Sequence, residues 1–142
     1  MDVLNSRSTV AGYRAVIVAA IALPKFFPLL MTPAGTVAPA RVLVLGAGVA
    51  GLRAIATARR MGAVVEAFDV RSSVREEVQS PGASFIDAGF FENAETAEGY
   101  ARPLSGDSQQ PAIVAIQSSI RSDDICITTA LIPNRRAPLL IL

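Results

Sequence analysis

The residues of this sequence whose types and spacing point most directly to chemistry are three glycines. Gly46, Gly48 and Gly51 form G-x-G-x-x-G directly after the apolar run Val42–Leu45. In a strand–turn–helix unit, the first glycine permits a tight turn, the second lets the backbone approach a pyrophosphate, and the third lets the helix pack closely on the sheet. The helix that follows would offer unpaired N–H groups and a partial positive charge to phosphates. The pattern predicts a dinucleotide site.

An acidic residue, Asp69, lies eighteen residues after Gly51, near the end of a second apolar run at 64–70. At the end of a strand its carboxylate can accept hydrogen bonds from an adenosine ribose, and it would repel a 2′-phosphate, which favours NAD over NADP. Two plainer interpretations remain open. The glycines could form a turn in an unrelated α/β protein, and Asp69 could be a strand-end carboxylate without a ligand.

The elements that must position these residues alternate between strand and helix. We therefore expect an α/β fold: a Rossmann-like, doubly wound parallel sheet, truncated to about four strands, in the order third–second–first–fourth along the chain. The expected strands are 41–45, 64–70, 83–86 and 124–131, and the expected helices are 50–61, a segment opened by the capping-box spacing Ser73–Glu76, and 111–120 with Pro111 near its start.

The first forty residues differ in character from the rest. We expect an N-terminal linker helix from about Ser8 to Leu23, and then a proline/glycine linker over 32–40, both belonging to a preceding subdomain. Residues 41–142 would form the dinucleotide-binding domain, incomplete at its C-terminus. The unbroken apolar run 15–23 has nine residues and ends at Pro24, whereas a membrane span needs about 20, so a helix buried against a neighbouring domain is expected.

Composition excludes several classes of function. The chain has 142 residues, 13 basic and 12 acidic, with a net charge of +1, which gives no reason to expect nucleic-acid binding. It has no histidine, hence no imidazole acid–base group, and no common metal-binding constellation. The one cysteine, Cys126, excludes an internal disulfide and is expected to be a buried small apolar residue. The apolar fraction of 51% suggests surface that a partner or neighbouring domain covers.

Segments around the glycines are more particular than the glycine motif itself. Together they resemble the NAD(H)-binding domain of the alpha subunit of proton-translocating NAD(P) transhydrogenases, and they match the related alanine dehydrogenases less closely. The segments that carry the resemblance are 8–16, 31–37, 50–58, 68–71, 94–101 and 127–133.

The resemblance implies direct hydride transfer between NAD(H) on this domain and NADP(H) on a partner domain, coupled to proton translocation. The nicotinamides carry the chemistry, while the protein positions them and excludes water. The implied partners are the NADP(H)-binding domain, the membrane part in the beta subunit, and a second NAD-binding domain in a dimer. The implied location is the cytoplasmic side of a bacterial inner membrane, as a peripheral part of the complex.

The resemblance also implies roles for individual residues. A loop at Glu92–Ser105 would close over the nucleotide, and the acid of an arginine–glutamine–aspartate set would lie near the nicotinamide. The implied residues are Gly46, Gly48, Val49, Ala50 and Gly51 at the pyrophosphate, Asp69, Val70 and Arg71 at the adenosine, Gly99 and Tyr100 in the loop, Ala130 and Leu131 beside the dinucleotide, Asp2 in the catalytic set, and Asn5 where the family usually has serine.

Departures from the family pattern lead us to expect a truncated chain that does not catalyse hydride exchange alone. The arginine and glutamine that accompany Asp2 would lie before Met1. Two rival functions remain. One is an amino-acid dehydrogenase of the alanine dehydrogenase type, which would need a lysine/histidine pair, although the only lysine is Lys25. The other is a non-catalytic nucleotide-binding module or remnant.

Overall fold

A four-stranded parallel sheet forms the centre of the molecule. The computed structural model describes residues 3–87, 106–131, 136 and 141. The strands β3 (Arg41–Leu45), β4 (Val64–Phe68), β5 (Ser84–Phe85) and β6 (Ile125–Thr128) lie in the order β5-β4-β3-β6. This confirms the predicted fold class and the predicted strand order. Strand β3 has the predicted bounds, whereas β4, β5 and β6 are shorter than predicted.

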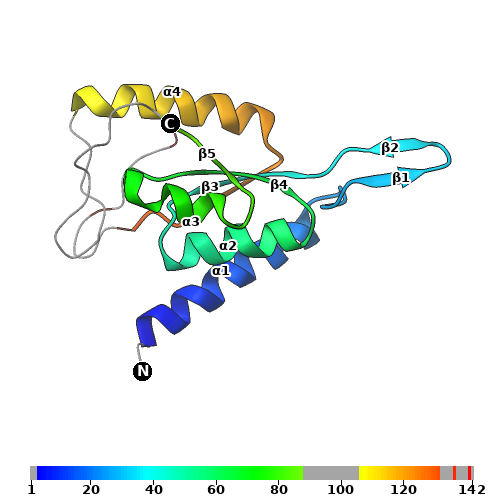
Figure 1. The fold of residues 1–142 in the computed structure, drawn as a ribbon, viewed down its shortest axis with the longest axis horizontal. Coiled ribbons are helices and arrows are strands. Elements are labelled where there is room, and N and C mark those ends of the chain that lie inside the picture. Colours follow the sequence, from blue (N-terminus) through cyan, green and yellow to red (C-terminus); the bar gives the residue numbers. More distant parts are fainter. Residues whose placement is uncertain (1–2, 88–105, 132–135, 137–140, 142) are drawn as a thin grey trace.

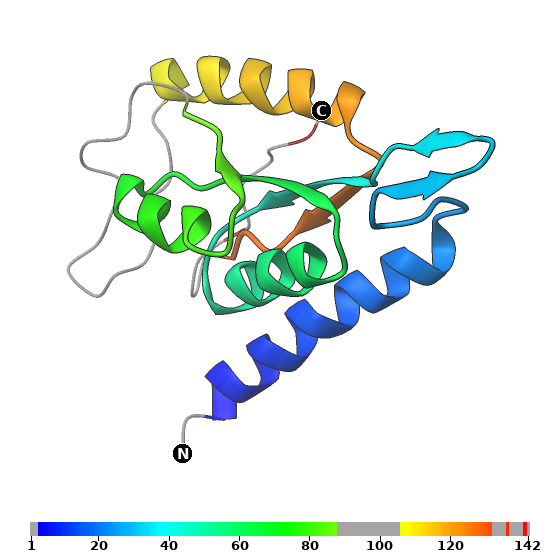
Figure 2. The ribbon, with the colours of Figure 1, turned by 45° about the vertical axis from the view of Figure 1, so that its right-hand side comes forward.

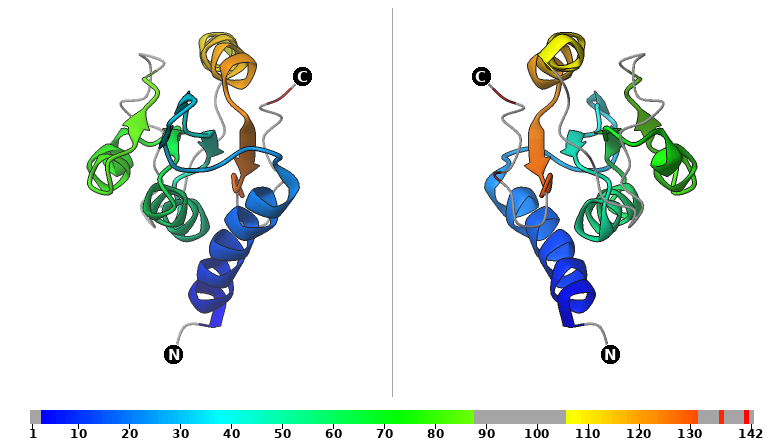
Figure 3. Two further views of the ribbon diagram at one scale, coloured as in Figure 1. Left: turned by 90° about the vertical axis from the view of Figure 1, so that its right-hand side faces the viewer. Right: turned by 90° about the vertical axis from the view of Figure 1, so that its left-hand side faces the viewer.

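Helices cover both faces of this sheet. Helix α4 (Gly106–Ser122) lies on one face, and α2 (Val49–Arg60) and α1 (Val3–Ala22) lie on the other (Figures 1 and 3). A short helix, α3 (Arg75–Gln79), follows a 3₁₀ turn at Ser72–Val74 on the α2 side. This layered arrangement buries both faces of the sheet, as parallel sheets require.

The central strand β3 shows why the sequence has an unbroken apolar run here and no alternation of apolar and polar residues. Val42 and Val44 belong to the core under α2, whereas Leu43 and Leu45 pack with Phe68 and with Ala112 and Ile116 of α4. The four apolar residues of β3 are almost wholly buried because each face of the strand meets a helix.

Helix α2 ends at Arg60, one residue before the predicted end at 61. Gly62 has φ +91°, a left-handed conformation that glycine adopts without strain, and its N–H donates to the Arg59 carbonyl at 3.0 Å. Strand β4 begins two residues after Gly62, so the chain returns directly from α2 to the sheet.

Helix α1 is longer than predicted and begins at Val3 rather than near Ser8. It crosses α2 (Figure 2), and it also contacts β6 of the sheet. The two helices approach closely at Gly12, where an added Cβ would lie 2.1 Å from the Ala50 carbonyl oxygen. Only glycine fits at this crossing, which therefore ties α1 to the first turn of α2. None of the helices in the described segments is both long and apolar enough to span a membrane.

The linker expected over 32–40 is wrong in its first half, which forms part of a β-hairpin. Strands β1 (Leu30–Thr32) and β2 (Gly35–Val37) pair antiparallel around Pro33 and Ala34, and the Thr32 hydroxyl donates to the Gly35 carbonyl at 2.8 Å. Each strand has three residues, too few to show an alternating pattern, and the proline and glycine of the turn are also typical of linkers. The hairpin projects away from the sheet (Figure 1).

Three further predictions need correction. Helix α4 begins at Gly106, so Pro111 lies inside it and not near its start. The N-cap residue of α3 is Val74 and not Ser73, so α3 does not open at the residue that the capping-box spacing Ser73–Glu76 predicted. Cys126 is exposed rather than buried, because β6 is an edge strand that pairs only with β3 among the described residues.

Charged side chains join the amino ends of the strands. Asp124 Oδ2 accepts hydrogen bonds from Lys25 Nζ and from the Arg41 backbone N–H, both at 2.8 Å. The Arg41 guanidinium donates to Asp123 at 3.1 Å and to Glu66 at 3.0 Å. The Lys25 hydrogen bond, followed by that of the Arg41 N–H, lowers the pKa of Asp124, whereas burial and then Glu66 raise the pKa of Asp123.

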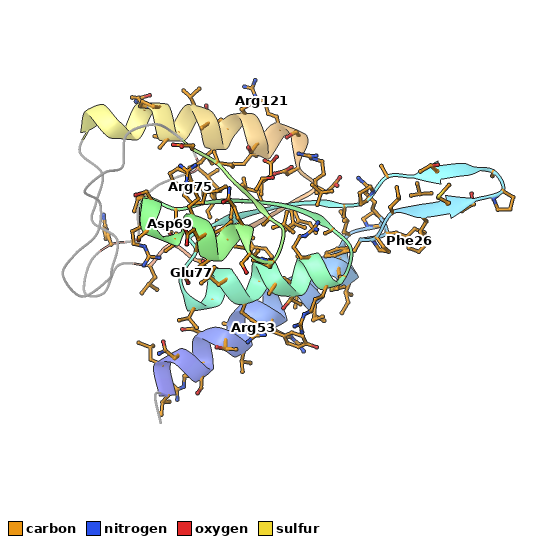
Figure 4. The ribbon with its side chains drawn as sticks, viewed as in Figure 1. Phe26, Arg53, Asp69, Arg75, Glu77 and Arg121 are labelled. Carbon is orange, nitrogen blue, oxygen red and sulfur yellow. The ribbon has the colours of Figure 1, made fainter. Side chains whose placement is uncertain are left out.

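We expect Asp124→Asn to lower the free energy of unfolding by about 1–2 kcal/mol at pH 7, because a charged acceptor of two hydrogen bonds is lost. The folded-state pKa of Asp124 is lowered, so its contribution is present above the ordinary value of 3.8 and is lost as pH falls through the folded value. Urea unfolding across pH measures this. Glu77→Gln, at an exposed acid of α3, is the control (Figure 4). A deficit that stays constant down to pH 2 would contradict this assignment.

Candidate functional site

The glycine turn lies between β3 and α2, at the carboxyl end of the parallel sheet. Gly46 has φ +98°, and its N–H donates to the Phe68 carbonyl at 2.8 Å. A Cβ at Gly46 would lie 2.8 Å from the Ala130 nitrogen and 2.9 Å from Thr129 Oγ1. Both the backbone angle and the close neighbours from the β6 side therefore require glycine, as expected for the residue that makes the tight turn.

Gly51 is required by the packing of the helix against the turn. An added Cβ would lie 1.8 Å from the Gly46 carbonyl oxygen and 3.0 Å from Thr129 Oγ1. No rearrangement of a flexible side chain relieves the first contact, because it involves backbone. The third glycine thus allows α2 to start immediately beside the end of β3, as the spacing predicted.

Gly48 differs from the other two glycines. A Cβ built there would meet nothing within 4 Å, and its φ of −76° is open to any residue. Gly48 is the N-cap residue of α2, and no side chain makes a cap hydrogen bond. The space beside the Gly48 Cα at the N-terminus of α2 is therefore open, which fits a pyrophosphate at a helix N-terminus.

Asp69 follows β4 and is held against this turn, with only 5% of its surface exposed. Its Oδ2 accepts a hydrogen bond from the Ala47 N–H at 2.7 Å, and its Oδ1 accepts one from the Arg71 N–H at 2.9 Å. The Arg71 guanidinium adds Nε to Oδ1 at 3.0 Å and Nη2 to Oδ2 at 3.1 Å. Figure 4 shows Asp69 at the end of the sheet where α2 begins.

Thr129 is a residue of the site that the sequence analysis missed. It follows β6, and its Oγ1 donates to the Gly46 carbonyl at 2.8 Å while its N–H donates to the Leu45 carbonyl at 2.8 Å. The signal available in the sequence was a threonine at the end of a strand next to the fingerprint strand. Nothing local distinguishes it from Thr128, which is exposed.

The structure brings most, but not all, of the other expected residues to this edge. Val49 and Ala50 open α2, Val70 follows Asp69, and Ala130 and Leu131 follow Thr129, with Leu131 77% exposed. Asn5 lies about two helical turns before Gly12 on α1, roughly 10 Å along the helix from the contact with α2. Asp2, Gly99 and Tyr100 lie outside the described residues.

Among the described residues, the side chains at the turn offer no free acid or base. The ionisable side chains described at the turn, Asp69 and Arg71, are paired with each other, and the Arg71 side chain is 13% exposed. A helix N-terminus, open space at Gly48 and a carboxylate nearby suit a ligand with phosphates and hydroxyls.

Comparison with known proteins gives consistent results. Residues 15–142 match the family model described as alanine dehydrogenase/PNT, C-terminal domain. The chain is 52% identical over 143 aligned residues to an NAD(P) transhydrogenase alpha subunit protein of Rhodospirillum rubrum, covering 99% of this chain and 37% of that protein. It is 48% identical over 141 residues to NAD(P) transhydrogenase subunit alpha of Haemophilus influenzae, covering 99% of this chain and 28% of that subunit.

Solved structures extend the comparison to the fold. Transhydrogenase from Sinorhizobium meliloti is similar at a TM-score of 0.80, with 48% identity and with 97% of this chain and 36% of that chain covered. An L-alanine dehydrogenase is similar at a TM-score of 0.66, with 25% identity and with 98% of this chain and 34% of that chain covered. The chain therefore spans about a third of the length of these relatives, and the similarity concerns one portion of longer proteins.

Gly51 and Gly48 should differ sharply on substitution. We expect Gly51→Ala to lower the free energy of unfolding by roughly 3 kcal/mol, because its Cβ would overlap the Gly46 carbonyl. Gly48→Ala should change it by less than about 0.5 kcal/mol, since its Cβ enters open space. Thermal and urea unfolding measure both. Equal destabilisation by the two substitutions would show that Gly48 is also packed against the protein.

Proposed function

The chain belongs to the alanine dehydrogenase/PNT C-terminal domain family, and on that premise we propose that it is the NAD(H)-binding part of a transhydrogenase. In this proposal hydride passes directly between NAD(H) on this domain and NADP(H) on a partner domain, coupled to proton translocation. The names of its relatives support the transhydrogenase assignment. The observation that carries NAD(H) binding is the open space at Gly48, beside the first turn of α2 and the Asp69 carboxylate.

The role of the chain in this proposal is to bind and orient. The nicotinamide, when bound, supplies the hydride chemistry. The α2 N-terminus with Gly46, Gly48, Val49, Ala50 and Gly51 would hold the pyrophosphate through backbone N–H groups and the helix dipole.

At the adenosine end, Asp69 would accept hydrogen bonds from the ribose and repel a 2′-phosphate. Val70 and Arg71 follow it in the chain and are proposed contacts to the same end of the nucleotide. Ala130 and Leu131 would flank the dinucleotide from the β6 side. The exposed apolar side chain of Leu131 is available to a planar ring.

Roles for Asp2 and Asn5 near the nicotinamide, and for Gly99 and Tyr100 in a closing loop, remain proposals drawn from the family resemblance. Since the second nicotinamide would come from NADP(H) on a partner domain, we expect no hydride exchange by this chain alone.

We further propose that the chain works in a larger assembly: with an NADP(H)-binding domain, with a membrane part in a beta subunit, and as a dimer, peripherally on the cytoplasmic side of a bacterial inner membrane. The β1–β2 hairpin supports a dimer. The stretch 26–40 carries no charged side chain, and Met31 is 83% exposed. A two-stranded hairpin in water is only marginally stable by itself, so a second uncharged surface would stabilise it.

An amino-acid dehydrogenase of the alanine dehydrogenase type is the second candidate, favoured by the solved L-alanine dehydrogenase fold. It would need a substrate base and a substrate-binding arginine, the base usually a lysine/histidine pair, and this stretch gives it no support. The only lysine, Lys25, pairs with Asp124 at the amino ends of the strands, opposite the glycine turn. The transhydrogenase proposal needs no such base and is therefore preferred.

Titration of the purified chain with NADH and NADPH, followed by nucleotide fluorescence, tests the proposal. We expect saturable NADH binding and much weaker NADPH binding. Gly48→Val should abolish NADH binding, because its side chain would occupy the path of the pyrophosphate, while leaving the fold intact. Circular dichroism checks folding, and Gly48→Ala gives an intermediate step in size. A folded wild-type chain that binds neither nucleotide would overturn the proposal.

Asp69→Asn should weaken NADH binding by about 1–3 kcal/mol, the scale of a charged hydrogen bond left unmade, and should reduce discrimination against NADPH. The asparagine amide cannot accept all the N–H groups that meet both carboxylate oxygens, so thermal unfolding must be measured in parallel. Unchanged NADH affinity with intact selectivity would contradict the ribose role of Asp69.

A further inference from the structure

The pair formed by Asp69 and Arg71 has a feature that the proposed function does not use. The Asp69 carboxylate accepts four hydrogen bonds, two on each oxygen, which is about the number that a carboxylate can accept. The ribose-binding acid of the proposed site is therefore saturated by the protein itself. A ribose hydroxyl can donate to Asp69 only if one of these donors leaves.

The four donors fall into two kinds. The N–H groups of Ala47 and Arg71 belong to the backbone of the glycine turn and of the segment after β4, so they are fixed by the fold. The other two donors, Nε and Nη2, belong to one side chain that can rotate away. Because the backbone donors remain, Asp69 would keep its position when the guanidinium leaves.

The Arg71 guanidinium also presents two donors to Asp69, as the ribose diol expected there would. Nε donates to Oδ1 and Nη2 to Oδ2, at 3.0 and 3.1 Å, so the fork spans both oxygens along one edge of the carboxylate. A vicinal diol presents two donors that can span a carboxylate in the same way. The same edge cannot serve both partners at once.

We propose that Arg71 is an internal ligand of Asp69 that competes with the adenosine ribose and thereby sets the affinity for NAD(H). This inference rests on the proposed function, concerns its affinity for NAD(H), and replaces the direct Arg71 contact proposed above with a competing one. In the nucleotide-free chain the guanidinium closes the carboxylate edge, and binding exchanges two charge-assisted hydrogen bonds within the protein for two hydrogen bonds to the ribose. The measured affinity is reduced by the cost of that exchange.

Substitution of Arg71 separates this competition from a simple binding contact. We expect Arg71→Ala to bind NADH about tenfold more tightly than the wild type, since displacement of hydrogen bonds to a charged group no longer opposes binding. Arg71→Lys keeps the positive charge but cannot form the two-pronged fork, so it should also bind more tightly. Arg53→Ala, which removes an exposed arginine of α2, is the matched control and should leave binding unchanged (Figure 4).

A second pair of ligands tests whether the effect of the Arg71 substitution on binding arises at the ribose. ADP carries the vicinal diol, and 2′,3′-dideoxy-ADP lacks it. Arg71→Ala should tighten ADP binding by a similar factor and leave dideoxy-ADP binding unchanged, because a ribose without hydroxyls does not need the carboxylate edge. Calorimetric titration of the 142-residue chain measures both, with thermal unfolding to check that each variant is folded.

The outcomes distinguish this inference from the function on which it rests. Saturable NADH binding by the wild type, with weaker or unchanged binding in both Arg71 variants, overturns the competition alone and makes Arg71 an ordinary contact or a bystander. Equal tightening of ADP and dideoxy-ADP binding also overturns it, by showing an effect away from the diol. Absence of NADH binding in the wild type and in both folded variants overturns the proposed function, and the competition with it.

Discussion

The structure depends on one constraint at the carboxyl end of the sheet: the glycine turn is held from both sides by groups from neighbouring strands. Asp69, after β4, accepts the Ala47 N–H at 2.7 Å, and Thr129, after β6, donates to the Gly46 carbonyl at 2.8 Å. These bonds satisfy turn groups that burial would otherwise leave unpaired, and they fix the direction in which α2 starts. The open space at Gly48 exists because the turn around it is held in place.

The two ends of the sheet carry polar residues for different purposes. At the amino ends, Arg41 and Lys25 pair with Asp123, Asp124 and Glu66, and these pairs tie the strands and the preceding segment together. At the carboxyl ends, Gly48 borders open space at the start of α2. Function in a parallel α/β sheet belongs to the second end, because loops there are free to vary while the first end holds the strands in register.

The helix α1 has a role in this arrangement that its apolar sequence does not reveal. Gly12 lets α1 cross the first turn of α2 within backbone contact distance. Helix α1 therefore supports the N-terminal end of α2, where the ligand is proposed to bind. A bulkier residue at Gly12 would push the two helices apart. The binding end of α2 is therefore supported by packing on one side and by hydrogen bonds at the turn on the other.

The sequence by itself determined the parallel sheet, its strand order and the position of the glycine turn, because these follow from local signals: apolar runs, glycine spacing and the length between strands. Only the tertiary structure decided which glycines are packed and which one borders open space, that Arg71 fills the edge of Asp69, and that Thr129 holds the turn. It also decided that Cys126 is exposed and that 30–37 is a hairpin. These features depend on which atoms of distant segments become neighbours, and residue type and spacing do not encode that.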